Sequence, residues 1–407
     1  MRLRRLPIAD LAAGHARPDG FGWLDPRDVY LDAACQSLRP QPVIDAVTAY
    51  YTTFGACGGR VRYAWGHRVD EEVGGARDAV LDLLDLSGRR YAVSFTLNTS
   101  YGLNLLLSQL PAGSFARVVT SHLEHNSVFL PSITTARRLG VERLVLERAA
   151  DGSLCYSPPQ LERAVVVVNV VSNVDGRRLL NLETLVRDTH ERGGIVVLDA
   201  AQAVPHALDL VRGTAADAVC WSGHKAYAPS LGVVVTRHEL LERLDLRFVG
   251  GGMVADVHEW DFELLPDQPA SRLEPGLQAW AEIVGLRAAL GWLGAWRVGG
   301  RTPDEHLHEL GERLYQGLAG VPGVRILNSC PGPIVSLYAP EQDAHRLAVF
   351  LSRQRIMVRS GYFCVHHGLK EHLGLPPLLR FSLGLHTTTA DVDAAVHALA
   401  RLMQGLA

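Results

Sequence analysis

The residues best suited to covalent chemistry are two short clusters that each follow an apolar run. Only two of the 40 basic residues are lysines, Lys225 and Lys370. Lys225 stands in the sequence SGHK with Ser222 and His224, after the run DAVCW. A primary amine can bond to a carbonyl compound, and the hydroxyl and imidazole beside it can hold an anion. Asp199, after the run IVVL, supplies a carboxylate that can balance a cation.

Both clusters are predicted to lie at the carboxyl ends of strands, where open α/β sheets bind ligands. Gln202 follows Asp199 in the sequence DAAQAV. An amine, a carboxylate and an anion cradle at one place are what pyridoxal phosphate requires: an aldehyde partner, a pyridinium partner and a phosphate site. We expect burial to raise the pKa of Asp199 and a cationic ring to hold its charge. The alternative is that Lys225 is a surface lysine and Asp199 a helix cap.

The elements that position these clusters form an α/β pattern. Apolar runs bounded by Gly, Asn or Asp alternate with amphipathic stretches, as in βαβ units whose strands are buried in a parallel sheet. One intervening stretch predicts a helix with Asn181 as its N-cap and Gly193 as its stop. The four runs are 165–171, 194–198, 217–221 and 232–236.

A second, smaller α+β domain is predicted in the C-terminal part. Helical patterns cover 305–320 and 342–356, a strand candidate covers 332–338, and a final helix over 391–406 follows three threonines that can cap it. We expect a large domain over residues 22–287, with residues 1–21 and 288–407 forming the small domain.

Composition excludes several classes of protein. The 407 residues carry a net charge of −3 with 47% hydrophobic and 20% charged residues, which is typical of a globular enzyme of two or three domains. We therefore expect no nucleic-acid partner. The six cysteines form no CxxC pair, which favours a reducing, cytoplasmic location. No run approaches a membrane span, and Asp10 interrupts the only stretch that could imitate a signal peptide.

The sequence resembles the cysteine desulfurases of the SufS and selenocysteine-lyase type, within the class V aminotransferase-like enzymes of fold type I. The resemblance extends from YLDAACQSLRP to LRFSLGLHTTTADVDAAV, and DAAQAV, SGHK and RSGYFC are its most specific parts. It implies a large, mostly parallel-sheet domain that binds pyridoxal 5'-phosphate, plus a smaller α+β C-terminal domain. It also implies a homodimer that removes sulfur from L-cysteine, leaving alanine, and a sulfur-acceptor protein as a further partner.

The same resemblance implies roles for individual residues. Lys225 corresponds to the lysine that bonds to the cofactor, and Asp199 to the partner of the pyridine nitrogen. Gln202 and Asn173 correspond to residues that reach the phenolic oxygen. His125, in SHLEHNSVFLP, corresponds to the histidine that stacks on the ring and acts in catalysis. The implied phosphate ligands are Thr99, Ser100, Ser222 and His224.

Two of these assignments keep simpler alternatives. Thr99 and Ser100 precede GLNLLLSQL, a predicted helix whose N-terminus favours a phosphate, but they could equally be ordinary helix caps. His125 lies in a polar turn and could be a histidine with structural hydrogen bonds only.

Two arginines are predicted to bind the substrate, Arg380 and Arg359. Arg380 lies in the apolar run PPLLRFSLGLH, where an unpaired guanidinium would be costly, so it needs an anion. The resemblance implies that this anion is the substrate α-carboxylate. A structural ion pair with an aspartate or glutamate is the alternative.

Cys364, in VRSGYFCVHHGL, is the predicted nucleophile, because Arg359, His366 and His367 can favour its thiolate. By resemblance it takes the sulfur of the substrate as a persulfide. The alternatives are a small buried apolar residue, or a metal ligand together with His366, His367 and His372. The spacing does not suit a closed metal site, and we expect none.

Several positions depart from the pattern of the resembling enzymes. Tyr362 and Phe363 replace the usual two histidines before the cysteine, and His386 replaces an asparagine. Gly276 is followed by Leu277 where a threonine commonly reaches the phosphate of the neighbouring subunit. The run GACGGRVRYAWG suggests a substrate other than free cysteine. The competing hypothesis is therefore a C–S lyase, epimerase or aminotransferase that acts on a larger amino acid. A non-catalytic sulfur-relay protein is disfavoured because the cofactor residues are complete.

Overall fold

The computed structural model describes residues 17–59 and 61–406, which form two compact units. Unit 2 comprises residues 42–172 and 178–294, and unit 1 comprises the described part of 1–41 together with 173–177 and 295–407. The sequence placed its boundaries at 21/22 and 287/288, and this division stays a prediction. Residues 1–16, which we expected in the small domain, lie outside the described residues, as do Arg60 and Ala407.

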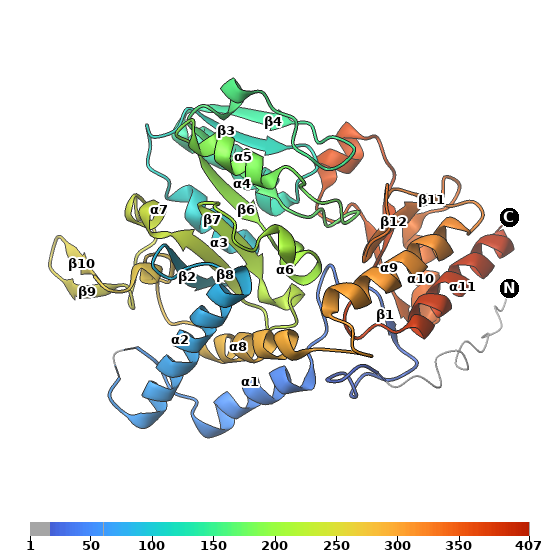
Figure 1. The fold of residues 1–407 in the computed structure, drawn as a ribbon, viewed down its shortest axis with the longest axis horizontal. Coiled ribbons are helices and arrows are strands. Elements are labelled where there is room, and N and C mark those ends of the chain that lie inside the picture. The colour runs from blue at the N-terminus through green and yellow to red at the C-terminus, as the bar shows by residue number, and fades with distance from the viewer. Residues whose placement is uncertain (1–16, 60, 407) are drawn as a thin grey trace. The chain divides into compact units, whose positions relative to one another are not determined.

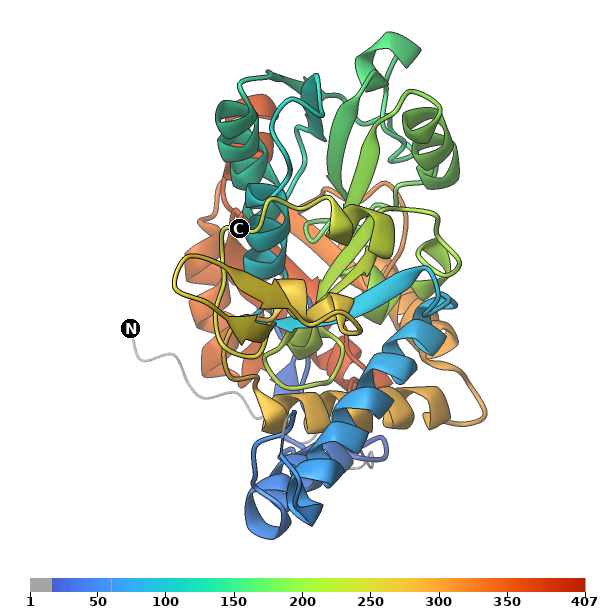
Figure 2. The ribbon, with the colours of Figure 1, turned by 90° about the vertical axis from the view of Figure 1, so that its left-hand side faces the viewer.

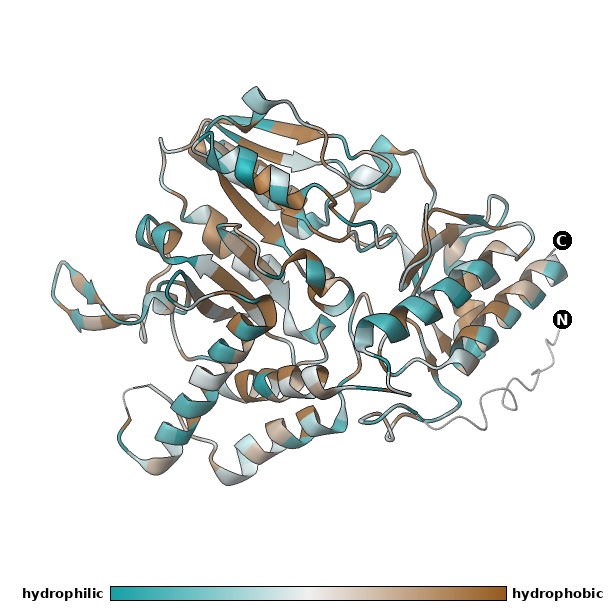
Figure 3. Cartoon of the chain, viewed as in Figure 1, coloured by the Kyte–Doolittle hydropathy of each residue, from teal (hydrophilic) through white to brown (hydrophobic). Residues whose placement is uncertain are grey.

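Unit 2 is built on a seven-stranded sheet (Figure 1). Neighbouring strands follow the order β2-β8-β7-β6-β5-β3-β4. Apart from the edge strand β4, the strands are apolar and buried along most of their length, which the brown strands of Figure 3 reflect. Their bounds are β2 (Tyr91–Thr96), β3 (Arg117–Ser121), β4 (Glu142–Leu146), β5 (Ala164–Asn169), β6 (Ile195–Asp199), β7 (Ala218–Ser222) and β8 (Gly232–Arg237).

The four predicted runs form β5, β6, β7 and β8, but one of them does not run parallel to the others. The pairs β4–β3, β3–β5, β5–β6 and β6–β7 are parallel, whereas β8 is antiparallel to both β7 and β2. The expectation that the run 232–236 joins a parallel set is therefore wrong. Only residues 223–231 separate β7 from β8, which is too short for the crossover that parallel neighbours need.

Helices cover both faces of this sheet. One apolar cluster joins alternate strand residues to α2, α5 and α8, and a second joins the other strand face to α3, α4 and α7. Because both faces are buried, the strands read as continuous apolar runs. The helices of this unit are α1 (Gln41–Thr53), α2 (Ala64–Leu84), α3 (Thr99–Ser108), α4 (Asn126–Leu139), α5 (Leu182–His190), α6 (Ala203–His206), α7 (His238–Glu242) and α8 (Trp280–Ala295).

Helix α5 lies where the sequence predicts a helix, but its N-cap differs from the prediction. The side chain of Asn181 makes no capping hydrogen bond. Instead, its Oδ1 accepts the N–H of Leu154 at 2.9 Å and its Nδ2 donates to the carbonyl of Leu154 at 3.0 Å. Asn181 therefore ties a preceding loop to the helix rather than closing the helix end.

An antiparallel hairpin, β9 (Val254–Val257) and β10 (Phe262–Leu264), projects from unit 2 (Figures 1 and 2). Two large apolar side chains are exposed near its tip, beside the polar residues His258, Glu259 and Asp261: Trp260 is 90% exposed and Val257 is 64% exposed. An exposed apolar surface of this kind is typical of a protein interface.

Unit 1 contains an antiparallel four-stranded sheet in the order β11-β12-β15-β14. A parallel pair, β1–β13, brings the N-terminal segment to this unit. Their bounds are β1 (Val29–Tyr30), β11 (Arg325–Ile326), β12 (Ile334–Tyr338), β13 (Ile356–Met357), β14 (Arg359–Gly361) and β15 (Leu378–Ser382).

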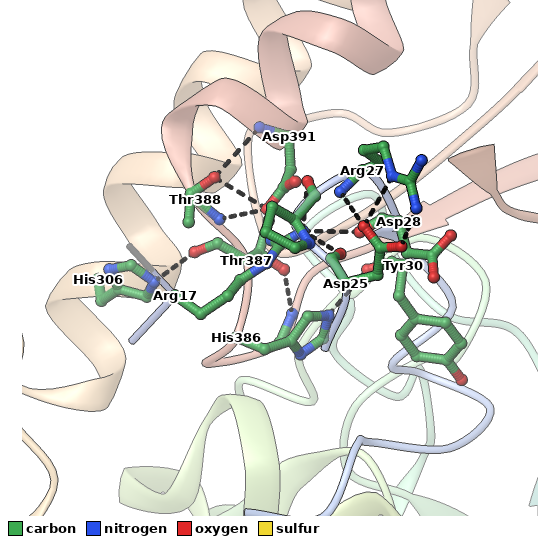
Figure 4. A network of polar contacts seen from close by, with 12 residues as sticks. Arg17, Asp25, Arg27, Asp28, Tyr30, His306, His386, Thr387, Thr388 and Asp391 are labelled. Carbon is green, nitrogen blue, oxygen red and sulfur yellow. Dashed lines mark hydrogen bonds and ion pairs between the residues drawn. The ribbon is translucent and has the colours of Figure 1, made fainter. Parts of the chain in front are cut away.

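Three helices complete unit 1: α9 (Pro303–Ala319), α10 (Ala344–Arg353) and α11 (Thr389–Leu406). Of the three threonines expected to cap the last helix, Thr388 does so: its Oγ1 accepts the N–H of Asp391, whose carboxylate accepts the N–H of Thr388. Arg17 pairs with the same carboxylate, inside the polar network of Figure 4. None of the described helices of either unit is both long and apolar enough to cross a membrane.

Candidate active site

Asp199 is the last residue of β6 and is 5% exposed. Its Oδ1 accepts the N–H of Ala201 at 2.9 Å. Burial raises the pKa of Asp199 to about 6, while the charge of Lys225 and this hydrogen bond act in the opposite direction. The carboxylate is therefore held at a place where a further cation would favour its charged form.

A buried ion pair lies just beyond the ends of β3 and β4 and acts on the charge of Asp199. Glu124 and Arg148 meet at 2.8 Å, and both side chains are almost completely buried. The Glu124 carboxylate also accepts the Oγ–H of Ser121 at 2.6 Å and the N–H of Asn169 at 2.7 Å. Asn169 is the register neighbour of Asp199, and the charge of Glu124 contributes to the raised pKa of Asp199. These hydrogen bonds connect the C-terminal ends of β3 and β5 to the turn that contains Glu124 and, directly after it, His125.

His125 is the N-cap of α4. Its Nδ1 accepts the N–H of Ser127 at 3.0 Å and lies 2.9 Å from the Oγ of Ser127, which also contacts the Oγ of Ser100. An Nδ1 that accepts a backbone N–H places the proton of the neutral ring on Nε2. His125 therefore makes the structural hydrogen bonds that the sequence analysis gave as an alternative. These bonds also fix the orientation of its ring.

Thr99 and Ser222 meet at the N-terminus of α3. The Oγ of Ser222 accepts the N–H of Thr99 at 2.9 Å and lies 2.5 Å from its Oγ1. The side chain of Asn98 caps the helix by accepting the N–H of Tyr101. Helix N-termini carry partial positive charge, and hydroxyls beside one are suitable donors to a phosphate. Asn98 is therefore the N-cap of α3, and the alternative in which Thr99 caps this helix is wrong.

The backbone around Ser222 is closely packed. A Cβ on Gly223 would lie 2.7 Å from the carbonyl oxygen of Pro229, and one on Gly232 would lie 2.3 Å from the Oγ1 of Thr96. Only glycine fits at these two positions. The close approach fixes the turn after β7 and therefore the residues that follow it.

His224 and Lys225 lie in a 3-10 turn, Gly223–Lys225, and both are half-buried. The charge of Lys225 lowers the pKa of Asp199, so amine and carboxylate interact within this unit. Gln202 is 3% exposed and precedes α6. Unit 2 thus holds an amine, a carboxylate and a helix N-terminus suited to an anion, which lie after β7, at the end of β6 and after β2 respectively.

Arg380 lies on β15 in unit 1 and is 3% exposed. Its Nη2 donates to the Oδ1 of Asp32 at 2.9 Å and its Nη1 donates to the carbonyl of Asn173 at 2.8 Å. The ring of Phe363 lies 4.7 Å from its Cζ. Burial lowers the pKa of Arg380, whereas Asp32 raises it. The ion pair with an acidic residue, left open as an alternative, is therefore formed by Asp32.

Arg380 still has a group available for a ligand. Its Nε is buried and has no hydrogen-bond partner among the described residues. Arg359, on β14, is about half exposed and its Nη1 lies 3.5 Å from the Oδ2 of Asp32. Two arginines thus share one carboxylate, and the binding of a substrate to either of them stays a prediction.

Cys364 is exposed, so the alternative of a small buried apolar residue is wrong. Its φ is 60° and that of Phe363 is 48°, so two successive non-glycine residues are left-handed. Each such conformation costs about 1–3 kcal/mol, and it persists only where neighbouring contacts offset this cost. Phe363 and Val365 are buried on either side, which leaves the thiol projecting from the loop.

Asn173 holds this loop from a distant part of the sequence. Its Nδ2 donates to the carbonyl of Phe363 at 2.8 Å. Its Oδ1 is buried without a hydrogen-bond partner among the described residues. An orphaned buried acceptor beside the orphaned Nε of Arg380 fits a site that is completed by a ligand.

The structure groups the predicted residues by unit. Unit 2 holds Thr99, Ser100, His125, Asp199, Gln202, Ser222, His224 and Lys225, and unit 1 holds Asn173, Arg359, Cys364 and Arg380. Sequence reasoning missed Asp32, Glu124 and Arg148. Both acidic residues lie in quoted motifs, YLDAACQ and SHLEHNS, but their partners are remote in sequence. The signal that could have identified these residues is the burial of a charged side chain, because a buried charge needs a partner.

Comparison with known proteins gives consistent results. The sequence profile of the Aminotransferase class-V family matches residues 29–395. A protein named "Probable cysteine desulfurase" from Streptomyces coelicolor is 31% identical over 387 residues, covering 91% of each chain.

Solved structures agree with this match. A cysteine desulfurase from Thermococcus onnurineus superposes with a TM-score of 0.83 at 26% identity, covering 93% of this chain and 95% of that one. A cystine C–S lyase superposes with a TM-score of 0.76 at 18% identity, covering 92% and 97%, which establishes a common fold only.

Proposed function

The chain belongs to the aminotransferase class-V family of pyridoxal-phosphate-dependent, fold-type I enzymes, and from this premise we propose that it is a cysteine desulfurase. The substrate is L-cysteine, and the products are alanine and a persulfide on Cys364. The observation that carries the proposal is the exposed, projecting thiol of Cys364 in the unit that also holds the Arg380 guanidinium. The curated relative from Streptomyces coelicolor is named a probable cysteine desulfurase, and the superposed protein from Thermococcus onnurineus is a cysteine desulfurase, which supports this reaction over others of the family.

The residues of unit 2 fit pyridoxal 5'-phosphate. The α3 N-terminus with Thr99 and Ser222 would hold the phosphate, Asp199 would pair with the ring nitrogen, and Lys225 would bond to the aldehyde. When bound, the cofactor withdraws electrons from the Cα of the amino acid and so makes its side-chain sulfur open to attack. The cationic ring would reverse the effect of burial on Asp199 and keep it charged.

The chain's own residues then bind the substrate and move its protons. The Nε of Arg380 would hold the α-carboxylate and thereby orient the Cα–H bond. The Nζ of Lys225 would remove the Cα proton and return a proton later. The Sγ thiolate of Cys364 would attack the substrate sulfur, so that an S–S bond forms while the C–S bond breaks. The Cβ left behind takes a proton, which gives alanine.

We also propose that the enzyme is a homodimer. Exposed apolar residues cluster in the segment 248–277, which includes the β9–β10 hairpin. Leu277, where relatives commonly have a threonine that reaches the partner's phosphate, is 77% exposed. The members of this exposed group are Phe248, Val249, Val257, Trp260, Phe262 and Leu277. Sedimentation of the purified protein tests this, and a monomer would contradict it.

A sulfur-acceptor protein and a cytoplasmic location complete the proposal. The cysteines of the chain are all free, and four of them, including Cys364, are exposed. Free exposed thiols fit a reducing compartment. An exposed persulfide at Cys364 would be accessible to the thiol of an acceptor.

The competing candidate is a C–S lyase, favoured by Tyr362 and Phe363 in place of the two histidines of the resembling desulfurases. Cys364→Ala decides between them. For a desulfurase, the variant should still exchange the α-proton of L-cysteine but form almost no alanine. Full activity with pyruvate and ammonia as products would establish the lyase.

Two further measurements test the cofactor assignment. Borohydride reduction of the yellow protein should attach the cofactor to Lys225, and an adduct at Lys370 would refute the site. Lys225→Ala should bind the cofactor and lose catalysis. In the wild type, turnover without reductant should add one sulfur to the Cys364 peptide, as measured by mass spectrometry.

A further inference from the structure

Three contacts join Asn173, Phe363 and Arg380 into a closed set within unit 1. Arg380 donates to the carbonyl of Asn173, Asn173 donates to the carbonyl of Phe363, and the Phe363 ring lies against the Arg380 guanidinium. All three residues are less than a tenth exposed. Because the three residues contact one another, a shift of any one of them also shifts the other two.

These three residues also stabilise the backbone conformation of the loop that carries Cys364. Phe363 and Cys364 both have positive φ, which non-glycine residues rarely adopt without support. Cys364 is exposed and is not a member of the apolar cluster beside it. The support comes from Asn173 and from the apolar cluster that Phe363 enters with Val174, Val365, Leu369 and Leu378.

We propose that Asn173 and Phe363 are positioning residues that couple the occupancy of Arg380 to the position of the Cys364 thiol. The inference rests on the proposed function and adds to it a link between substrate binding and the nucleophile. A carboxylate bound at the free Nε of Arg380 fixes the plane of the guanidinium. The Phe363 ring that lies against this plane is then fixed as well, and Cys364 follows it directly in the chain.

The link explains why an aromatic residue at position 363 suits this chain. A phenyl ring keeps its attraction for a guanidinium at every pH, whereas a protonated histidine would repel it. The replacement of histidine by Phe363 thus exchanges a titratable group for a permanent contact with Arg380. Tyr362 packs only at the edge of the same apolar cluster, and its ring pairs with that of His366 at 5.7 Å rather than with Arg380.

Hydrogen exchange of the cofactor-loaded protein tests the support of the loop without any substrate. The peptide covering 361–369 should exchange about fivefold faster or more in Asn173→Ala and in Phe363→Leu. Tyr362→Leu is the matched control, and its exchange should stay within about twofold of the wild type. Equal exchange in Phe363→Leu and Tyr362→Leu would overturn the positioning role.

The coupling itself is tested with L-alanine, which carries the same α-carboxylate as the substrate. Saturating L-alanine should slow exchange of the 361–369 peptide in the wild type by about threefold or more, and should have little effect in Phe363→Leu. Calorimetry establishes separately that L-alanine binds to each protein. If L-alanine binds and slows exchange equally in both, the coupling is refuted. If it does not bind, the substrate role of Arg380 fails, while the ligand-free comparison still decides the role of Phe363.

Discussion

Replacing Asp199 with asparagine should stabilise the cofactor-free protein at neutral pH. Burial raises the pKa of Asp199 from 3.8 to about 6, so folding favours its protonated form. The protonated carboxyl stabilises the fold fully below pH 3.8, and this stability is lost as the pH rises through about 6. The shift of about two pKa units corresponds to roughly 3 kcal/mol in the free energy of unfolding.

Urea unfolding of apoprotein measures this directly. Asp199→Asn should be more stable than the wild type by up to about 3 kcal/mol at pH 7.5, and the difference should vanish near pH 4. The asparagine Oδ1 can still accept the N–H of Ala201, so the local structure is preserved. With the cofactor bound, the order should reverse, because asparagine cannot pair with a cationic ring.

A second buried carboxylate serves as the matched control. Asp217 accepts the N–H of Val196 at 2.7 Å and lies 2.8 Å from the Nε2 of His190. The Oδ2 of Asp217 accepts the N–H of Val196 and also contacts His190, so Asp217→Asn weakens at least one of these contacts and should be destabilised at pH 7.5. If apo Asp199→Asn were no more stable than the wild type at pH 7.5, burial would not be the force that acts on Asp199.

Three further perturbations follow from the same contacts. Burial lowers the pKa of His386 to about 4, so the stability that the neutral ring contributes is present above pH 6.5 and is lost as the pH falls toward 4. In urea unfolding, His386→Gln should therefore remove roughly 3 kcal/mol of the loss of stability in acid, and an unchanged pH profile would contradict this. Arg148→Met leaves the buried Glu124 unpaired and should cost about 3–5 kcal/mol of unfolding free energy, most of it recovered in the double variant with Glu124→Gln; no recovery would show that shape rather than charge matters. Leu277→Thr should tighten cofactor binding by up to about 1 kcal/mol in a fluorescence titration, and unchanged affinity would mean that another group already fills that place.

The sequence predicts well what depends on local pattern. Apolar runs identify four strands of the large sheet, and the position of a polar residue just after each run identifies Asp199 and Lys225 as groups at the same edge. The direction of β8 was not predictable from its own residues, because a buried antiparallel strand and a buried parallel strand are equally apolar. The short connection before it was the available signal.

Contacts between segments that are far apart in the sequence could not be predicted. Asp32 and Arg380 are 348 residues apart, and nothing in either motif identifies the other as its partner. The left-handed backbone of Phe363 and Cys364 was also unpredictable, since residues of these types normally avoid it. In both cases tertiary contacts decide the outcome, and a single sequence does not encode them in a local pattern.

The composition of unit 1 from separate segments sets the order in which the protein is completed during synthesis. Residues 17–41 and 173–177 belong to this unit, but they wait for residues 295–407 before their partners exist. Arg17, for example, pairs with Asp391. At about 5–20 residues per second, the ribosome needs several seconds or more to supply that last part. Unit 2, which carries Lys225, can therefore fold first, and unit 1, which carries Cys364, becomes complete only after its last segment has been made.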